Sequence, residues 1–250
     1  MVRAWYFAQK NFGDVLNKDL IETLSKDKVE CIRGQTDVSG PVYACCGSII
    51  QYLDVPCTIW GAGFIAEDSN LKTIPSSVRA VRGPRTRDKL LSLNVQCPEV
   101  YGDPGLLMPR IYDLKPDPRY ELGIIPHYMD KTNEFLPKEG NGIKIINVFG
   151  GPRSIVETML RCKKIISSSL HGLIVAEAYG LPTLWVRFSD LIIGGNFKFL
   201  DYYESIEADV TEPIYIKSPT SWLELSKQCT IKPLKINLRK LLETCPFYKK

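Results

Sequence analysis

Short apolar runs alternate with amphipathic stretches in both halves of this chain, and this alternation constrains the fold more than any other feature. Apolar runs of a few residues are typical of buried strands, whereas apolar residues spaced three and four apart are typical of helices. In the first half, the pattern predicts strands at 5–8, 42–44, 58–60 and 78–81 and helices at 15–24 and 85–93. In the second half, it predicts strands at 122–125, 143–148, 164–166 and 183–186 and helices at 153–161 and 170–179.

Strands that alternate with helices indicate parallel sheets covered by helices on both faces. We therefore predict an α/β protein built from two doubly wound, Rossmann-like domains. The stretch 112–120 is rich in prolines and charges and shows no periodic pattern, so it is the expected linker. The expected divisions are residues 1–115, residues 116–225, and a basic C-terminal helix or tail at 226–250.

Composition narrows the class of protein. The chain has 250 residues, of which 44% are hydrophobic and 24% charged, and this usage is typical of globular proteins. No apolar run approaches the roughly 18–20 residues that cross a bilayer, and the start is too weakly apolar for a secretory signal, so a cytoplasmic protein is expected. The 8 cysteines include no Cys-x-x-Cys pair and there are only 2 histidines, which indicates reduced thiols and no zinc site.

The formal net charge of +4 is concentrated at the C-terminus. Residues 227–250 contain seven Lys or Arg and one acidic residue, so the remainder is slightly acidic and does not predict a nucleic-acid surface. An apolar helical stripe runs through this segment. Two interpretations stay open: the helix packs on the body of the protein with its basic face in solvent, or it forms a peripheral contact with the anionic inner face of a membrane. The stripe consists of Leu234, Leu238, Leu241, Leu242 and Cys245.

The loops that follow the expected strands are the candidate functional segments, because ligands of parallel α/β sheets bind beyond the carboxyl ends of the strands. Glycines in these loops allow a ligand to approach the backbone, and serines and helix N-terminal amides suit an anion. Arginine, histidine and lysine side chains add cationic partners. The loops are 11–14, 61–64, 82–88, 126–128, 167–172 and 189–198.

Several of these loop residues have two interpretations. Asp14 could be a helix N-cap or a ligand group. Arg82 ends an apolar strand, where a charge is costly unless it is paired or bound to a ligand, whereas Arg85 and Arg87 could lie on a solvated face. His171 stands beside three serines at a strand-to-helix turn, which favours a binding role over a core histidine. We expect Arg82 and His171 to be essential and neither to anchor the core.

Seven segments, taken in order, resemble the polysaccharide pyruvyl transferase family. The similarity runs from Asn11 to Tyr203, and the serine-rich turn with His171 is its most specific part. The resemblance implies two facing Rossmann-like domains, as in GT-B glycosyltransferases. It also implies transfer of pyruvate from phosphoenolpyruvate to a hydroxyl pair of a sugar, which forms a pyruvate ketal during bacterial exopolysaccharide or capsule biosynthesis. The segments are Asn11-Phe12-Gly13-Asp14, Ile59 to Phe64, Arg79 to Pro84, Gly102-Asp103-Pro104, Ile125 to Tyr128, Ile166 to Gly172 and Phe197-Lys198-Phe199.

The resemblance further implies roles for individual residues. His171, Arg82 and Asp14 would be catalytic, and Asp103 is an alternative acid or base unless it only shapes the turn before Pro104. No cofactor and no metal are expected, and the partners would be phosphoenolpyruvate and a sugar acceptor, free or lipid-linked. The residues that would bind phosphoenolpyruvate are Arg82, Ser168, Ser169, His171 and Lys198. The residues that would line the cleft for donor or acceptor are Asn11, Gly63, Phe64, His127 and Tyr128.

Two other functions stay open. A GT-B-like glycosyltransferase that uses a nucleotide sugar would need a carboxylate for the ribose, and Glu177 on the helix after His171 is the candidate. A sugar- or anion-binding module that kept the fold without activity is the non-enzyme alternative. The number of cationic and polar residues at the loop ends disfavours the binding module.

Overall fold

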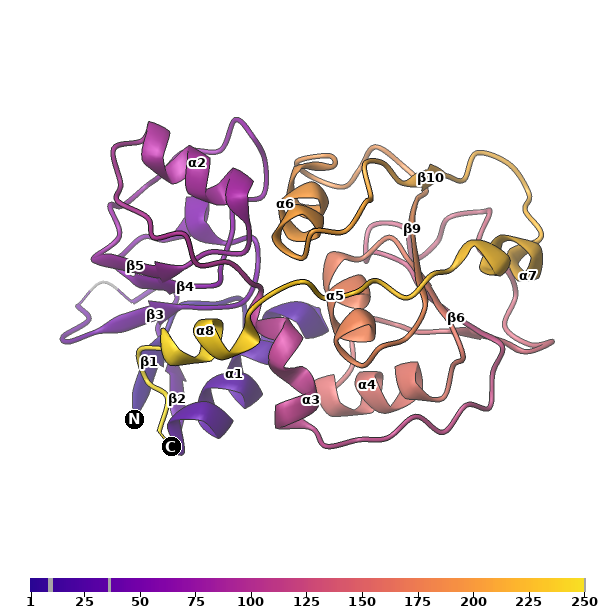
Figure 1. Ribbon diagram of the computed structural model, residues 1–250, viewed down its shortest axis with the longest axis horizontal. Helices are drawn as coiled ribbons and strands as arrows, with labels where there is room; N and C mark the ends of the chain where they lie inside the picture. Colours follow the sequence, from indigo (N-terminus) through magenta and orange to yellow (C-terminus); the bar gives the residue numbers. More distant parts are fainter. Residues whose placement is uncertain (9–10, 36, 250) are drawn as a thin grey trace.

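The computed structural model, which describes residues 1–8, 11–35 and 37–249, contains two five-stranded parallel sheets, one in each half of the chain (Figure 1). The first sheet has the strand order β2-β1-β3-β4-β5 and the second has the order β10-β9-β8-β6-β7. The predicted parallel α/β class is therefore confirmed. The first sheet consists of β1 (Val2–Ala4), β2 (Val29–Cys31), β3 (Val42–Ala44), β4 (Thr58–Trp60) and β5 (Ser77–Ala80). The second consists of β6 (Leu122–Ile125), β7 (Ile143–Ile145), β8 (Ile165–Ser167), β9 (Thr183–Arg187) and β10 (Ile214–Tyr215).

Helices connect these strands, and the four helices predicted between strands are present, each starting within a few residues of its expected position. A proline occupies the first position of both α2 and α4, where the missing amide would have had no helical partner. Helix α5 is buried along its length, in keeping with its nearly all-apolar sequence. The helices of the first half are α1 (Phe12–Ser25), η1 (Ile50–Tyr52), α2 (Pro84–Ser92), η2 (Pro104–Leu107) and α3 (Met108–Ile111). Those of the second are α4 (Pro152–Leu160), α5 (Leu170–Ala178), α6 (Phe197–Ser205), α7 (Trp222–Leu225), η3 (Ser226–Gln228) and α8 (Leu238–Glu243).

Three predicted elements differ from the structure. The apolar run 5–8 follows β1 instead of forming it, and the Trp5 indole donates to Asp54 Oδ1 at 2.6 Å. The predicted strand 143–148 ends at Ile145. The predicted loop 189–198 gives way to α6 at Phe197, which places Lys198 in the first turn of a helix. Strands β2 and β10 were not predicted because segments of two or three residues carry too little periodicity.

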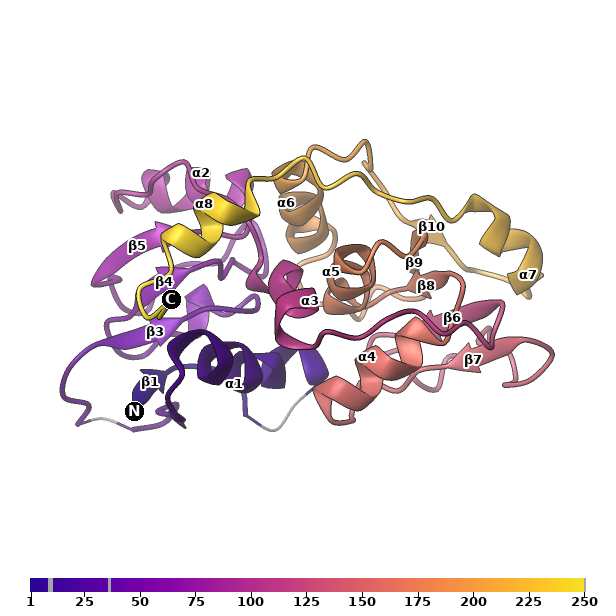
Figure 2. The same ribbon diagram turned by 60° about the horizontal axis from the view of Figure 1, so that its bottom comes forward.

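The two halves are joined by apolar packing as well as by the chain. The stretch 113–119 between α3 and β6 has no helix or strand, in agreement with the predicted linker. Helix α1 of the first half lies beside α4 of the second (Figure 2). Phe12 and Leu16 of α1 share one buried cluster with Val156 and Leu160 of α4. The apolar core therefore continues from one half of the chain to the other.

The C-terminal segment returns to the first half, where α8 lies against the first sheet (Figure 1). Leu241 is fully buried, and its carbonyl accepts a hydrogen bond from Trp60 Nε1 at 2.9 Å. The ring of Phe247 packs edge-on against Trp60 and Tyr43. The apolar stripe thus faces protein, which favours the packing interpretation over lipid contact. Lys250, the last residue of the predicted tail, lies outside the described residues. Of the helices that the structure describes, none is long and apolar enough to cross a membrane.

Candidate active site

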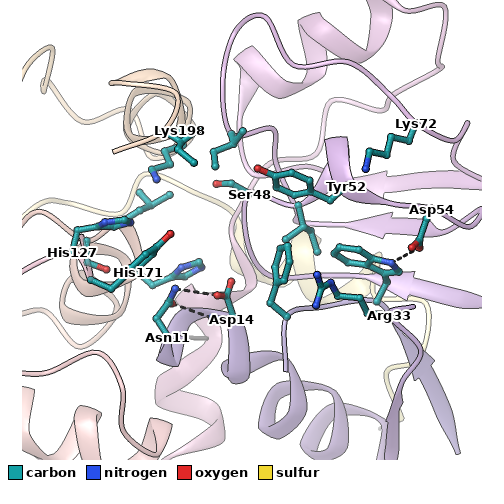
Figure 3. Close-up of a pocket in the computed structure, with 18 residues that line it drawn as sticks. Asn11, Asp14, Arg33, Ser48, Tyr52, Asp54, Lys72, His127, His171 and Lys198 are labelled. Carbon is teal, nitrogen blue, oxygen red and sulfur yellow. Dashed lines mark hydrogen bonds between the residues drawn. The ribbon is translucent and has the colours of Figure 1, made fainter. Parts of the chain in front are cut away.

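A pocket of about 420 Å³ is lined by residues of both halves of the chain (Figure 3). In each half, the lining segments follow strands, where a parallel sheet presents its carboxyl ends. The first half contributes Trp5, Phe7, Asn11, Asp14, Arg33, Ser48, Ile49, Tyr52, Asp54, Ile65 and Lys72. The second half contributes His127, Tyr128, Ser169, Leu170, His171, Ile193 and Lys198.

The structure brings seven of the predicted site residues together on this pocket. They come from the N-terminus of α1, the loop after β6, the N-terminus of α5 and the first turn of α6. These segments are far apart in sequence, and only the packing of the two halves places them around one cavity. The seven are Asn11, Asp14, His127, Tyr128, Ser169, His171 and Lys198.

Asn11, and not Asp14, is the N-cap of α1. The Asn11 side chain accepts from the Asp14 amide at 3.3 Å, and its Nδ2 donates to Asp14 Oδ2 at 3.0 Å. Asp14 stands in the first turn, with its carboxylate on the pocket (Figure 3). The interpretation of Asp14 as a cap is therefore wrong, and Asp14 lines the pocket.

His171 lies against a buried carboxylate. Its Nε2 is 3.6 Å from Asp103 Oδ2 and 3.5 Å from the sulfur of Cys46. The other carboxylate oxygen, Oδ1, accepts from the Gly105 amide at 2.8 Å and from the Cys46 thiol at 3.0 Å. A Cβ at Gly13 would collide with the His171 ring, so a glycine is required where α1 approaches it. His171 is thus fixed between the start of α1 and Asp103.

The electrostatics of this cluster favour a charged Asp103 and a neutral Cys46. Burial alone would raise the pKa of the Asp103 carboxyl, but its electrostatic interaction with His171 and the hydrogen bonds from Cys46 and Gly105 hold it below its usual value. Burial and the neighbouring Asp103 raise the pKa of the Cys46 thiol well above its usual value. An ionised carboxylate behind an imidazole orients the ring.

The same three side chains have the spacing of a metal site. One sulfur, one carboxylate oxygen and one imidazole nitrogen, from Cys46, Asp103 and His171, lie within 4.8 Å of one another. Local spacing in the sequence could not reveal them, because Asp103 and His171 are 57 and 125 residues from Cys46. The expectation that no such cluster exists near the loop ends is wrong.

Lys198 and His127 place two hydrogen-bond donors on the pocket (Figure 3). Burial, reinforced by the charge of Arg82, lowers the pKa of Lys198 to about 8, so its ammonium predominates at neutral pH. Burial and the charge of Lys198 lower the pKa of His127 to about 3. The Met129 amide donates to His127 Nδ1 at 3.3 Å, which leaves the proton of the neutral ring on Nε2.

Arg82 does not reach the pocket surface. It is fully buried, and its guanidinium donates to Asp201 Oδ2 at 2.8 Å, to Ser48 Oγ at 2.6 Å and to the Phe64 carbonyl at 2.6 Å. Direct binding of the donor phosphate by Arg82 would require these bonds to rearrange. The expectation that Arg82 does not anchor the core is wrong, because Asp201 belongs to α6 and the ion pair joins the two halves. Arg82 can act on the pocket through Ser48, which does line it.

Asp201 also caps α2 from the other half of the molecule. Its Oδ1 accepts from the Thr86 amide at 2.8 Å and its Oδ2 accepts from the Thr86 hydroxyl at 2.7 Å. A Cβ at Gly83 would collide with the Asp201 main chain, so this close approach requires glycine. Arg85, by contrast, pairs with Glu204 at the surface, in keeping with the solvated-face interpretation.

Three other predicted residues lie behind the pocket wall. The Ser168 hydroxyl accepts from the His127 amide at 2.8 Å and donates to Asp130 at 3.1 Å, so it positions the His127 loop. Gly63 is buried against the Arg82 guanidinium, which would collide with a Cβ there, and Phe64 is fully buried in the core of the first half.

Glu177 is also remote from the pocket. Its carboxylate accepts from the Thr183 and Tyr202 hydroxyls at 2.6 Å each, and burial raises its pKa. This arrangement makes Glu177 a structural group of the second half, and the carboxylate expected for a nucleotide ribose is not available there.

The sequence did not indicate the part of the pocket formed by Arg33, Ser48, Tyr52, Asp54 and Lys72. Arg33 follows β2, which was not predicted, so the rule that loops after strands carry function could not be applied to it. Ser48 follows β3 and could have been found by that rule.

The chain is similar to a known family, to a viral protein and to a protein of solved structure. The family model described as polysaccharide pyruvyl transferase matches residues 11–190. An uncharacterized protein of Acanthamoeba polyphaga mimivirus is 35% identical over 207 residues, which cover 79% of this chain and 71% of that protein. A crystal structure of a functionally uncharacterized protein from Klebsiella pneumoniae shares the fold, with a TM-score of 0.52 and 13% identity over 87% of this chain and 93% of that one. Since the family model spans most of the sequence, the chain belongs to the polysaccharide pyruvyl transferase family.

Proposed function

We propose that this protein transfers pyruvate from phosphoenolpyruvate to two hydroxyls of a sugar and releases phosphate. The observation that carries the proposal is the convergence of Lys198, His127, His171 and the Ser169 end of α5 on one side of the pocket. Together they offer a buried ammonium, imidazole groups and a helix N-terminus to a ligand with a phosphate and a carboxylate. Membership of the family supports the same reaction.

The reaction balances with the groups present. The enol carbon of phosphoenolpyruvate takes up a proton and becomes a methyl group. One sugar hydroxyl adds to the neighbouring carbon, the second hydroxyl displaces phosphate from it, and a cyclic ketal results. The two sugar hydroxyls lose two protons. One offsets the proton that the enol carbon takes up, and the other leaves with phosphate.

Roles for individual residues follow from their positions. Lys198, with the His127 Nε2–H, would hold the phosphate as the leaving group gains charge. His171, supported by Asp103, would deliver the proton to the enol carbon, and Asp14 would accept a proton from a sugar hydroxyl. Ser48, which receives a hydrogen bond from Arg82, would contact the ligand from the first half. The facing, GT-B-like arrangement implied by the resemblance would bring donor and acceptor together between the halves.

A nucleotide-sugar glycosyltransferase is disfavoured, because the carboxylate that would hold the ribose is buried away from the pocket. An exopolysaccharide or capsule precursor, free or lipid-linked, is the proposed acceptor, and the cytoplasm is the proposed location. The basic side chains of the C-terminal segment would contribute at most an electrostatic contact with anionic lipid, since its apolar stripe packs on protein.

The test is an incubation of the purified protein with phosphoenolpyruvate and candidate saccharide acceptors, followed by mass spectrometry and a phosphate assay. We expect a product heavier by one pyruvate less one water, with equimolar phosphate, and loss of both signals in His171→Ala. Product formed from a nucleotide sugar instead of phosphoenolpyruvate would contradict the proposal. Leu223→Ala, an exposed substitution on α7, serves as the control.

A further inference from the structure

One end of the pocket takes no part in the donor site proposed above. It belongs entirely to the first half and is formed by Phe7, Arg33, Tyr52, Asp54 and Lys72, here called the first-half end. Figure 3 shows Arg33, Asp54 and Lys72 on the side of the pocket away from His127 and Lys198. A ligand at this end would face a donor held by the second half across a shared cavity.

The first-half end has an ordered aromatic wall. The Phe7 ring meets Trp5 edge-on at a centroid distance of 5.3 Å and meets Tyr52 edge-on at 5.7 Å. Trp5 is buried and bonded to Asp54, whereas Phe7 and Tyr52 are half-buried and keep surface on the pocket. Rings fixed in this way present apolar surface at little entropic cost, and the C–H faces of a sugar ring pack well against such surface.

The same end carries two cations. The Arg33 guanidinium lies 4.4 Å from the centre of the Phe7 ring and 5.8 Å from that of Trp5, which fixes its position. Within the described part of the chain, neither Arg33 nor Lys72 is paired with a carboxylate. The carboxylate of this end belongs to Asp54, and it already accepts the hydrogen bond of Trp5 Nε1.

Both cations are exposed on the pocket, and Asp54, the carboxylate of this end, forms no ion pair with either of them among the described residues, so a neutral sugar would leave them unpaired. A phosphate group satisfies both, because the guanidinium fork matches two of its oxygens and an ammonium can bond a third. The charge and the aromatic wall together therefore fit a sugar that carries phosphate.

We propose that the first-half end binds the acceptor and that the acceptor is a sugar bearing a phosphate or diphosphate. The sugar ring packs on Phe7 and Tyr52, a sugar hydroxyl donates to Asp54, and the phosphate lies between Arg33 and Lys72. The inference rests on the proposed function, since it takes the donor to occupy the other end. A glycosyl phosphate and the diphosphate of a nucleotide- or lipid-linked sugar share this chemistry.

The first experiment is calorimetric titration of inorganic pyrophosphate into protein saturated with phosphoenolpyruvate. We expect one site, whose affinity falls with added salt and falls roughly tenfold in Arg33→Ala and in Lys72→Ala. Both variants should bind phosphoenolpyruvate as the wild type does. Lys115→Ala, at an 83% exposed position in the linker, is the matched control and should change neither affinity.

The second experiment compares three probe sets on the same protein: hexose 1-phosphates, the corresponding free hexoses and hexuronic acids. At least one hexose 1-phosphate should bind more tightly than its free hexose. Phe7→Ala and Tyr52→Ala should weaken the binding of that sugar phosphate more than they weaken the binding of pyrophosphate. Tighter binding of a hexuronic acid than of every hexose 1-phosphate would assign the cations to a sugar carboxylate and overturn the phosphate proposal.

The outcomes separate this inference from the proposed function. Normal phosphoenolpyruvate binding with no pyrophosphate site, or with a site indifferent to Arg33→Ala and Lys72→Ala, overturns the inference alone. Failure of phosphoenolpyruvate to bind overturns the proposed function. In that case, pyrophosphate titration of His171→Ala beside Arg33→Ala still shows which end holds the anion.

Discussion

Lys198 gives the pocket a charge that titrates close to neutral pH. With a pKa of about 8 in the free protein, its ammonium is present at pH 7 and is lost as the pH rises through 8. The phosphate of the donor is a dianion above its second pKa of roughly 6, so it keeps its charge over this range. We expect the Kd for phosphoenolpyruvate to rise roughly tenfold between about pH 7.5 and 9. Titration calorimetry across this range measures the Kd. The Lys198→Met variant should bind phosphoenolpyruvate weakly, with a Kd that does not change with pH. A wild-type Kd that does not depend on pH would contradict the assignment.

Asp103 acts through His171 in this structure. Asp103→Asn keeps the shape and one acceptor but removes the charge that faces the imidazole. We expect turnover to fall by about two orders of magnitude, with the melting temperature little changed. In His171→Ala, turnover should fall by about two to three orders of magnitude. If Asp103→Asn kept the rate, Asp103 would only shape its turn.

Arg82 is expected to be essential for stability as well as activity. Removing one member of a fully buried ion pair leaves the other uncompensated, so Arg82→Ala should lower the free energy of unfolding by about 3–5 kcal/mol. Arg82→Lys should recover little, because one ammonium cannot replace three guanidinium bonds. Urea unfolding of Arg82→Ala, Asp201→Ala and the double variant provides the test. Strictly additive losses would show that the pair does not couple the two halves.

Helix α8 stabilises the first half, although it lies at the far end of the chain. Leu241 is fully buried beside Trp60. Leu241→Ala should therefore cost about 2–5 kcal/mol of unfolding free energy through lost burial and the resulting cavity. Leu223→Ala, at a 42% exposed position on α7, is the matched control and should cost far less. Equal midpoints in urea for the two variants would contradict this packing role.

Folding assembles Cys46, Asp103 and His171 from both halves of the molecule, and we expect them to hold protons instead of a metal. Asp103 already faces the His171 imidazole, and burial keeps the Cys46 thiol protonated. Elemental analysis of the purified protein should find far less than one zinc per chain, and chelator should leave turnover unchanged. Stoichiometric zinc that is lost in Cys46→Ser would establish a metal site.

The course of the chain was largely readable in advance because helix and strand periodicity is encoded by neighbouring residues. Strands β3, β4 and β6 coincide with their predicted ranges, and α1, α4 and α5 lie within a few residues of theirs. The rule that loops after strands carry function also found much of the pocket, including Asn11 and His127.

The partners of the charged side chains were decided only by tertiary structure. The sequence shows that Arg82 ends an apolar strand and must be paired or bound, but its partner Asp201 stands 119 residues away on α6. The contact of His171 with Asp103 and the return of α8 to the first half are equally non-local. A periodic pattern specifies which face of an element is buried; which distant groups meet there depends on how the two sheets pack, and that packing set the chemistry of this pocket.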